Sequence, residues 1–141
     1  MKLVLDASAA AKWYVREVDA AKAARLRVDF HMGRHELIAP DTFHAHSADV
    51  FVTAERQGLL DPGEAAGALN DLLIVGVVLQ PAAPLLPRAI ELALSARLTV
   101  MASLYVALAE REQCQFLTAD QRVVRAARKH FPFVITFAAL P

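Results

Sequence analysis

Two aspartates, Asp6 and Asp120, each follow a short apolar run and precede a stretch of helical composition. The first run is KLVL at 2–5 and the second is CQFLTA at 114–119. If both runs are strands of one parallel sheet, both carboxylates open onto the same edge, where open α/β sheets bind ligands. Carboxylates grouped at such an edge suit a hard divalent cation. The alternative is that each aspartate only caps the helix that follows it.

Short β-rich runs alternate with helical segments, and this alternation predicts the frame that holds the carboxylates. Strands are predicted at 2–5, 36–40, 77–80, 114–119 and 133–137, and helices after Ser8 and at 18–32, 41–57, 62–73, 84–97, 99–112 and 120–131. Ser8 and Asp41 are the expected N-caps, and Gly33 and Gly58 the expected helix stops. The pattern predicts an α/β fold, a three-layer α/β/α sandwich with a mainly parallel central sheet, formed by 1–141 as one domain.

Composition narrows the classes of function. Fifteen basic and fifteen acidic residues give a formal net charge of zero, so any RNA contact is expected to be local rather than extended. Cys114 is the only cysteine, which excludes an intrachain disulfide and a cysteine-based zinc site. The start, MKLVLDAS, carries no apolar signal segment, and the run from Leu72 to Leu79 is too short to span a bilayer. We therefore expect a cytoplasmic protein without membrane contact.

Several short motifs, taken in their order and spacing, resemble the PIN domain of VapC-type toxins. They are VLDASAAAKW near the start, AP before a long helix, ASLYVALAE, and FLTAD. The block at 104–120, LYVALAEREQCQFLTAD, is the most specific, and the resemblance runs from Lys2 to about Leu140. It implies a ribonuclease that depends on Mg²⁺ or Mn²⁺, is commonly a homodimer, and is neutralised by a small antitoxin protein.

The family's site holds four acidic residues, and the resemblance assigns two of them here. The aspartate after the first strand falls on Asp6, with its companion serine at Ser8. The aspartate of the last motif falls on Asp120, with its companion threonine at Thr118. The resemblance thus makes Asp6 and Asp120 the catalytic and metal-binding pair, and Ser8 and Thr118 their supports.

The other two acidic positions of the family are not acidic in this chain. The expected glutamate, about six residues beyond the proline of the second strand, is His46, and the expected aspartate of the helix before the fourth strand is Ala102. The loss should weaken Mg²⁺ binding, because Mg²⁺ gains most of its affinity from anionic oxygen ligands. His46 could ligate Mn²⁺, Ni²⁺ or Zn²⁺. Asp49 could supply a replacement carboxylate from a neighbouring helix face, whereas Ser103 is turned about 100° from the vacant position.

Two functional hypotheses follow. The first is a metal-dependent endoribonuclease in which cleavage with Mg²⁺ is weak or absent. The second is a non-catalytic binding module with the PIN fold that acts through protein or RNA partners. A third, a response-regulator-like receiver, is disfavoured because the third predicted strand ends at Gln80 and Pro81 without a phosphoacceptor aspartate.

The remaining candidate groups have plain structural interpretations. The four cations after Asp120 are interpreted as a solvated helix face, with phosphate contact as the alternative: Arg122, Arg125, Arg128 and Lys129. Trp13 and Tyr14 are expected in the core or in a dimer interface, His44 at the surface, and Cys114 in a buried, inert position. A stripe of Leu86, Ile90, Leu92 and Ala93 is expected to be core.

Overall fold

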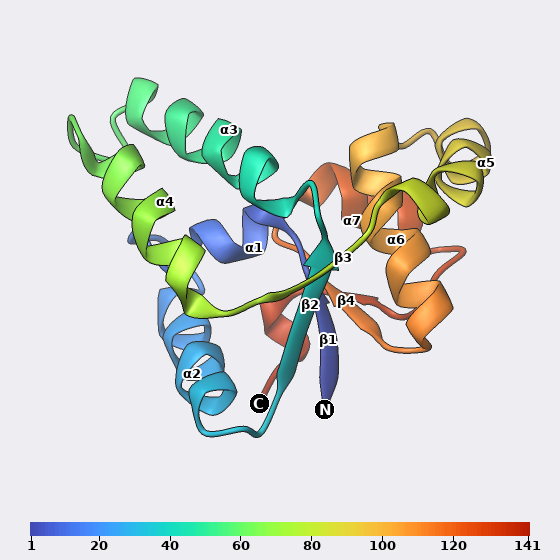
Figure 1. Cartoon of the computed structure of the whole chain (residues 1–141), viewed down its shortest axis with the longest axis horizontal. Helices are drawn as coiled ribbons and strands as arrows, with labels where there is room; N and C mark the ends of the chain where they lie inside the picture. The colour runs from blue at the N-terminus through green and yellow to red at the C-terminus, as the bar shows by residue number, and fades with distance from the viewer.

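The computed structural model describes residues 1–141 and contains five strands in one sheet flanked by helices (Figure 1). The strands are β1 (Lys2–Leu5), β2 (Glu36–Pro40), β3 (Val78–Gln80), β4 (Gln115–Leu117) and β5 (Val134–Ile135). The helices are α1 (Ala7–Ala11), α2 (Ala20–His31), α3 (Phe43–Arg56), α4 (Glu64–Val75), α5 (Leu86–Ala96), α6 (Val100–Glu112) and α7 (Gln121–Ala127), with 3₁₀ turns η1 (Ala83–Leu85) and η2 (Phe137–Ala139).

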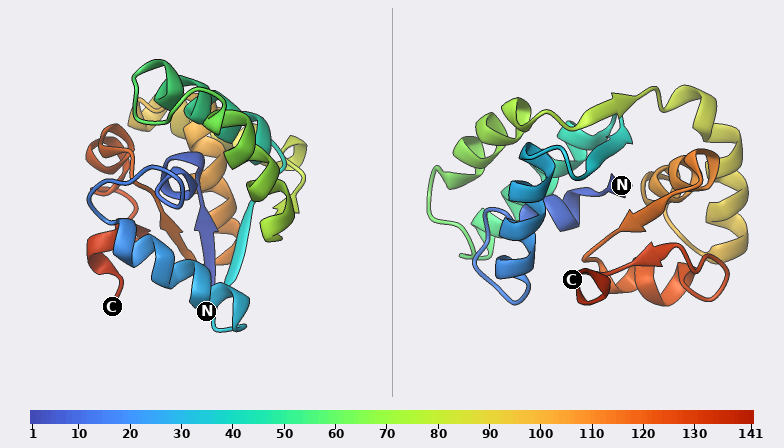
Figure 2. Two further views of the ribbon diagram at one scale, coloured as in Figure 1. Left: turned by 90° about the vertical axis from the view of Figure 1, so that its left-hand side faces the viewer. Right: turned by 90° about the horizontal axis from the view of Figure 1, so that it is seen from below.

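The sheet has the order β3-β2-β1-β4-β5, and every neighbouring pair is parallel. The chain begins in the central strand, moves to one edge through β2 and β3, and then crosses back to β4 and β5. The strand order therefore reverses between β1 and β4, which is where open parallel sheets bind ligands. Seen along the sheet, α1 to α4 lie on one side and α5 to α7 on the other (Figure 2). The predicted three-layer α/β/α sandwich is confirmed.

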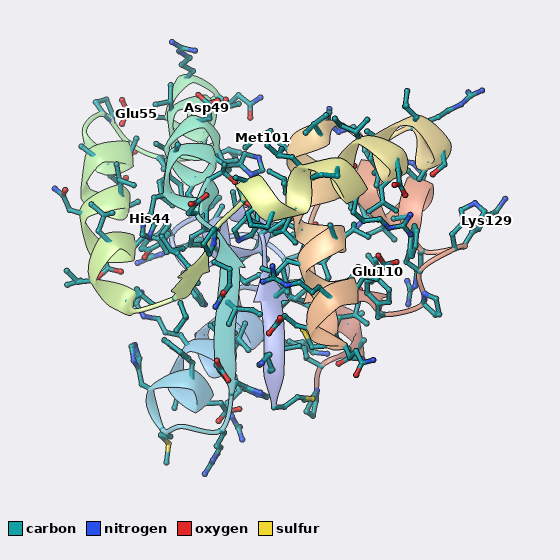
Figure 3. The ribbon with its side chains drawn as sticks, turned by 45° about the vertical axis from the view of Figure 1, so that its right-hand side comes forward. His44, Asp49, Glu55, Met101, Glu110 and Lys129 are labelled. Atoms are coloured by element: carbon teal, nitrogen blue, oxygen red, sulfur yellow. The ribbon has the colours of Figure 1, made fainter.

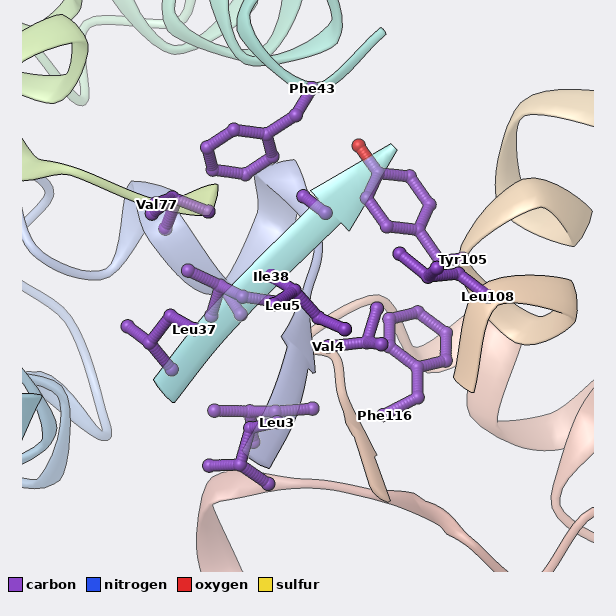
Figure 4. Packing of buried hydrophobic residues seen from close by; sticks show 14 of the residues in the cluster. Leu3, Val4, Leu5, Leu37, Ile38, Phe43, Val77, Tyr105, Leu108 and Phe116 are labelled. Atoms are coloured by element: carbon purple, nitrogen blue, oxygen red, sulfur yellow. The ribbon is translucent and has the colours of Figure 1, made fainter. Parts of the chain in front are cut away.

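The core lies on both faces of the central strands, so those strands are apolar throughout rather than alternating. Leu3, Val4 and Leu5 of β1 are all fully buried. Figure 4 shows side chains of β1 and β2 packed against the surrounding elements, with Tyr105 of α6 among them and its hydroxyl directed toward the end of β2. Tyr105 stacks on Phe116 of β4 with ring centroids 5.7 Å apart, so α6 is anchored directly on the sheet.

The helix caps differ from those predicted. Asp6, not Ser8, caps α1, since its carboxylate accepts from the backbone N–H of Ala9. Thr42 holds the N-cap position of α3, and no side chain makes a capping hydrogen bond there. Asp41 instead accepts a hydrogen bond of 3.1 Å from the backbone N–H of Ala82, which joins the ends of β2 and β3. Asp6 and Asp41 thus both accept hydrogen bonds from backbone N–H groups, but only Asp6 does so at the start of a helix.

The element bounds are otherwise close to those predicted. The strand at 36–40 has the predicted limits. Gly33 and Gly58 follow α2 and α3 with φ of +77° and +78°, in the left-handed region that glycine tolerates best. The strands predicted at 114–119 and 133–137 are shorter, at three and two residues. Asp120 therefore lies three positions beyond the end of β4: the Thr118 N–H still donates to the carbonyl of Ile135, and the Ala119 N–H donates to the Ser8 hydroxyl.

Two predictions about side-chain burial have different outcomes. Trp13 and Tyr14 pack against the core, as one of the two alternatives predicted: the Trp13 indole donates to the carbonyl of Ala23 at 2.8 Å, and the Tyr14 hydroxyl donates to Asp71 at 2.6 Å. The α5 stripe is different. Leu92 is buried, but Leu86 and Ile90 are exposed, so the prediction of a continuous core stripe is wrong. Leu86, Ile90 and Leu94 share one outward face of α5 because they are four residues apart.

No single helix is long and apolar enough to cross a membrane, and only the pair Ala83–Ala96 and Val100–Glu112, bent by 114°, meets that length and composition together.

Candidate functional site

A network of hydroxyl groups and one carboxylate joins the ends of β1 and β4. Asp6 accepts three hydrogen bonds: from the Ser8 hydroxyl at 2.7 Å, from the Ala9 N–H at 2.8 Å and from the Thr118 hydroxyl at 2.5 Å. Ser8 in turn accepts from the backbone N–H of Ala119 at 3.0 Å. Because the Ser8 and Thr118 hydroxyls each donate a hydrogen bond to Asp6, the network holds the two strand ends together around one carboxylate.

Asp6 is buried, with 4% of its surface exposed. Burial raises the pKa of its carboxyl group above the ordinary value, because the charged form is poorly solvated. The hydrogen bonds from Thr118, Ser8 and Ala9, and the nearby His46, act in the opposite direction on this pKa. The carboxylate is therefore held in place by its neighbours rather than by water.

Asp120 lies beside this network but is more accessible. Its backbone N–H donates to the Thr118 hydroxyl oxygen at 3.1 Å, which places it next to Asp6. Its carboxylate caps α7 by accepting from the backbone N–H of Arg122 at 2.9 Å. The Arg122 guanidinium approaches the same carboxylate at 3.3 and 3.4 Å. The capping interpretation of Asp6 and Asp120 is thus correct for both, and it coexists with their convergence.

Both aspartates open into a cavity of about 680 Å³ at the carboxyl ends of β1 and β4. His46 of α3 and Ala102 of α6 line the same cavity, so all four positions expected to form one site border it. Figure 3 shows Asp49 on α3 and Met101 at the start of α6, which face the cavity from its two helix layers. A second cavity of about 550 Å³ adjoins it along α1 and α3 and shares His46, Asp49 and Arg122 in its lining.

His46 is held by a residue that the sequence pattern did not single out. Its Nδ1 lies 2.9 Å from the hydroxyl of Tyr105, which is fully buried. Burial raises the pKa of the Tyr105 hydroxyl, and the nearby Asp6 carboxylate adds to the effect, so this group stays protonated. Tyr105 lies three residues after Ala102 and therefore on a neighbouring face of α6. The three-residue spacing from Ala102 is the feature of the sequence that could have indicated that Tyr105 lies near the cavity.

The other candidate side chains are placed as follows. Asp49 lines the cavity, is exposed and makes no hydrogen bond. Ser103 is fully buried and donates to the backbone carbonyl of Thr99 at 2.8 Å, so it faces away from the cavity as expected. His44 is half-buried and lies outside the cavity. Cys114 is half-buried rather than buried, and burial raises the pKa of its thiol, which keeps it protonated and unreactive.

Two arginines, Arg97 and Arg122, line the cavity, and only Arg122 belongs to the cations for which the sequence left phosphate contact as the alternative to a solvated helix face. Arg122 lines both cavities, while Arg125, Arg128 and Lys129 are exposed away from them. Lys129 extends outward at the right-hand edge of the molecule in Figure 3. Arg97, at the junction of α5 and α6, also lines the main cavity. No sequence signal marked it, because its direction depends on the left-handed backbone (φ 56°, ψ 40°) at this junction.

The residues of the cavity do not fit a protein-held Mg²⁺ site. No group of three or more histidine, cysteine, aspartate or glutamate side chains is arranged to hold a metal ion. Asp6 accepts three protein hydrogen bonds, and Asp120 is engaged by Arg122. Mg²⁺ requires near-octahedral oxygen ligation. Asp49 is the one carboxylate of the cavity without a hydrogen-bonding partner, and one free carboxylate is too few for that coordination.

Comparison with known proteins finds one protein of similar sequence and one of similar structure. The chain is 33% identical over 138 residues to Ribonuclease VapC3 of Pyrobaculum aerophilum, an alignment that covers 96% of this chain and 99% of that protein. Its structure is similar to the crystal structure of PAE2754 from Pyrobaculum aerophilum, with a TM-score of 0.70 and 20% sequence identity over 99% of this chain and 95% of that chain. This second likeness bears on the fold alone. No family model matches the chain.

Proposed function

We propose, because this chain belongs to the VapC family of ribonucleases and has their PIN-like fold, that it is directed at RNA and that its Mg²⁺-dependent cleavage is weak or lost. One observation supports the second part of the proposal. The cavity holds Asp6 and Asp120, but its remaining walls carry His46 and Ala102 where carboxylates would be needed. Two anionic ligands fewer lower the electrostatic attraction for a divalent cation severely.

If catalysis is retained, it would depend on a metal other than Mg²⁺. In the tautomer whose Nδ1–H donates to the Tyr105 hydroxyl, the unprotonated Nε2 of His46 is available to a metal such as Mn²⁺, Ni²⁺ or Zn²⁺. Asp49 is free of protein partners and lies on the same helix. Weak binding of Mn²⁺ by Asp6, Asp120, His46 and Asp49 is therefore part of the proposal, with Mg²⁺ bound less well, and it requires these side chains to move together, since no three of them are grouped around one point.

A ribonuclease assay tests this proposal. The chain is incubated with a total RNA preparation in EDTA, in Mg²⁺ and in Mn²⁺, beside an Asp6→Ala/Asp120→Ala variant. We expect the chain and the variant to give the same background in Mg²⁺. Robust cleavage in Mg²⁺ that disappears in the double variant would overturn the proposal, since two carboxylates would then suffice.

The alternative function is a non-catalytic binding module. The specific observation in its favour is the pair of arginines that line the cavity with His46, since these groups can hold an anion without performing hydrolysis. In this alternative RNA would be bound and retained. An RNA that binds in EDTA and is recovered intact after incubation with Mg²⁺ or Mn²⁺ would favour it.

The proposal includes two protein partners. One is a small antitoxin, as expected for a toxin of this family. The other is a second copy of the chain. The exposed face of α5 formed by Leu86, Ile90 and Leu94 supports a homodimer, because apolar side chains aligned on one helix face are suited to packing against an identical face across a two-fold axis.

A further inference from the structure

We infer that the main cavity binds the phosphodiester backbone of single-stranded RNA directly, through Arg97, Arg122 and His46, without a bridging metal ion. The inference rests on the proposed function that the cavity is directed at RNA, and it names the side chains that hold the phosphate. Its basis is that the cavity contains more hydrogen-bond donors than its carboxylates bind, so donors remain for a ligand.

Arg97 is the first of these donors. It lines the cavity, and its exposed side chain makes no hydrogen bond or ion pair with any other residue. Its backbone is in the left-handed region, with φ 56° and ψ 40°, where a residue other than glycine is disfavoured. A guanidinium with five N–H groups and no protein acceptor is available for a phosphate, to which it can bind in bidentate geometry.

Arg122 supplies the second donor, from the first turn of α7. Its contacts with the Asp120 carboxylate are long, at 3.3 and 3.4 Å, and its side chain is 86% exposed. An exposed ion pair of this kind contributes at most about 1 kcal/mol. The guanidinium can therefore turn from Asp120 to a phosphate at little cost, while Asp120 keeps its capping hydrogen bond from the Arg122 N–H.

His46 supplies the third donor. Its Nδ1 is occupied by the Tyr105 hydroxyl, so Nε2 is the ring nitrogen available to a ligand. When the protonated hydroxyl of Tyr105 donates to Nδ1, the neutral ring carries its own hydrogen on Nε2. Tyr105 is then a positioning residue: it keeps His46 as a donor toward the cavity. The first turn of α6, at Thr99 to Ala102, adds partial positive charge on the neighbouring wall.

The carboxylates of the cavity oppose phosphate binding to different degrees. Asp6 accepts three hydrogen bonds, and Asp120 keeps the capping hydrogen bond from the Arg122 backbone N–H when the guanidinium turns to a phosphate. Asp49 lines the cavity without a partner, so it is the carboxylate that repels a phosphate most directly. This gives opposite expectations for one variant. If RNA binds directly, Asp49→Asn should tighten RNA binding; if RNA binds through a metal that Asp49 ligates, the same change should weaken it.

The test is fluorescence anisotropy with a short labelled single-stranded RNA and the full chain, in EDTA and in Mn²⁺. The variants are Arg97→Asn, Arg122→Ala, His46→Gln and Asp49→Asn. Asparagine tolerates the left-handed backbone at position 97 while removing the charge. Arg125→Ala is the matched control, since it removes one cation from the same helix as Arg122 but from outside the cavity. Thermal melting of each variant confirms that it is folded.

We expect binding in EDTA that Arg97→Asn and Arg122→Ala each weaken about tenfold, as for the loss of one charge-assisted hydrogen-bonding group. His46→Gln should weaken it less, Arg125→Ala by about twofold at most through general electrostatics, and Asp49→Asn should tighten it. Two results would overturn the inference. One is RNA binding that appears only with Mn²⁺; the other is binding in EDTA that Arg125→Ala weakens as much as Arg97→Asn and Arg122→Ala do.

The outcomes separate this inference from the proposed function. RNA bound only in Mn²⁺, with Asp49→Asn weakening it, would refute direct phosphate binding and leave an RNA-directed metal site intact. RNA bound in neither condition would refute both. Binding in EDTA together with robust cleavage in Mg²⁺ would support the arginine contacts and overturn the loss of catalysis.

Discussion

Asp6 serves two structural purposes with the same carboxylate. It caps α1 through Ala9, and it receives the Ser8 and Thr118 hydroxyl protons that hold β1 against the segment after β4. Burial nevertheless raises its pKa, so the charged form is held at a cost in folding free energy that the hydrogen bonds only partly offset.

The pH dependence of stability follows from that direction. A carboxyl group whose pKa is raised by folding stabilises the folded state below its ordinary value of 3.8, and this contribution is lost as the pH rises through the folded value. We therefore expect Asp6→Asn to match the parent chain at low pH and to melt at a higher temperature near neutrality. Melting curves over a pH series measure this. Asp49→Asn is the control, because this exposed side chain makes no hydrogen bond. A lower melting temperature for Asp6→Asn at every pH would show that the hydrogen bonds outweigh burial.

Restoring the missing carboxylates should restore metal binding. We expect the double variant Ala102→Asp/His46→Glu to bind Mn²⁺ or Mg²⁺ at least about tenfold more tightly than the parent chain, since two anionic ligands are added to the cavity that holds Asp6 and Asp120. Isothermal titration calorimetry measures the change. The matched control is Val100→Asp, on the same first turn of α6 but exposed and outside the cavity lining. No gain in the double variant would mean that positions 46 and 102 do not direct their side chains at a shared ion.

The residues of the site differ in how far the sequence could indicate them. Asp6 and Asp120 were predictable because each follows an apolar run, and parallel strands bring such positions to one edge. The contact between His46 and Tyr105 joins residues of different elements, 59 positions apart. Arg97 carries no motif at all. Such contacts depend on how α3, α5 and α6 pack, which local pattern does not specify.

At the scale of elements, the strands and helices were predictable where the hydrophobic pattern agreed with the residues that end an element, such as proline and glycine. The strand at 36–40 is bounded by polar Glu36 and by Pro40, and both limits are correct. The caps were less predictable because several residues compete for them. Ser8 has a suitable hydroxyl for capping, but Asp6 and Ala119 engage it, so Asp6 takes the cap. Competition of this kind is decided by tertiary contacts rather than by local preference.

The junction between α5 and α6 gives an element-scale prediction. Arg97 ends α5 in the left-handed conformation, in which glycine is unstrained. We expect Arg97→Gly to stabilise the fold by about 0.5–1 kcal/mol, or a few degrees in melting temperature. At the same time it should weaken RNA binding as Arg97→Asn does. A variant that is more stable but binds less RNA would show that the arginine is kept for a ligand. Destabilisation would instead show that its side chain supports the junction.

At the scale of the whole molecule, the two helix layers leave different outer surfaces. On α5, Leu86, Ile90 and Leu94 are 39%, 52% and 80% exposed and lie on one face of the helix. On the opposite layer, Ile74 of α4 is also exposed, at 81%. The two surfaces lie on opposite sides of the sheet, so a substitution on one leaves the other unchanged. This makes them a matched pair for testing where a second copy binds.

We expect Leu94→Glu to convert the proposed homodimer into a monomer, because it places a charge in the proposed apolar contact, while Ile74→Glu leaves the dimer intact. The dissociation constant should rise by about a hundredfold or more, the equivalent of roughly 3 kcal/mol. Size-exclusion chromatography with light scattering over a concentration series measures it. The melting temperature gives an independent reading: that of the parent chain should rise with concentration, since association stabilises the folded state, and that of Leu94→Glu should not. A dimer lost in Ile74→Glu but kept in Leu94→Glu would move the interface to α4, and a parent chain that is monomeric at all concentrations would remove it.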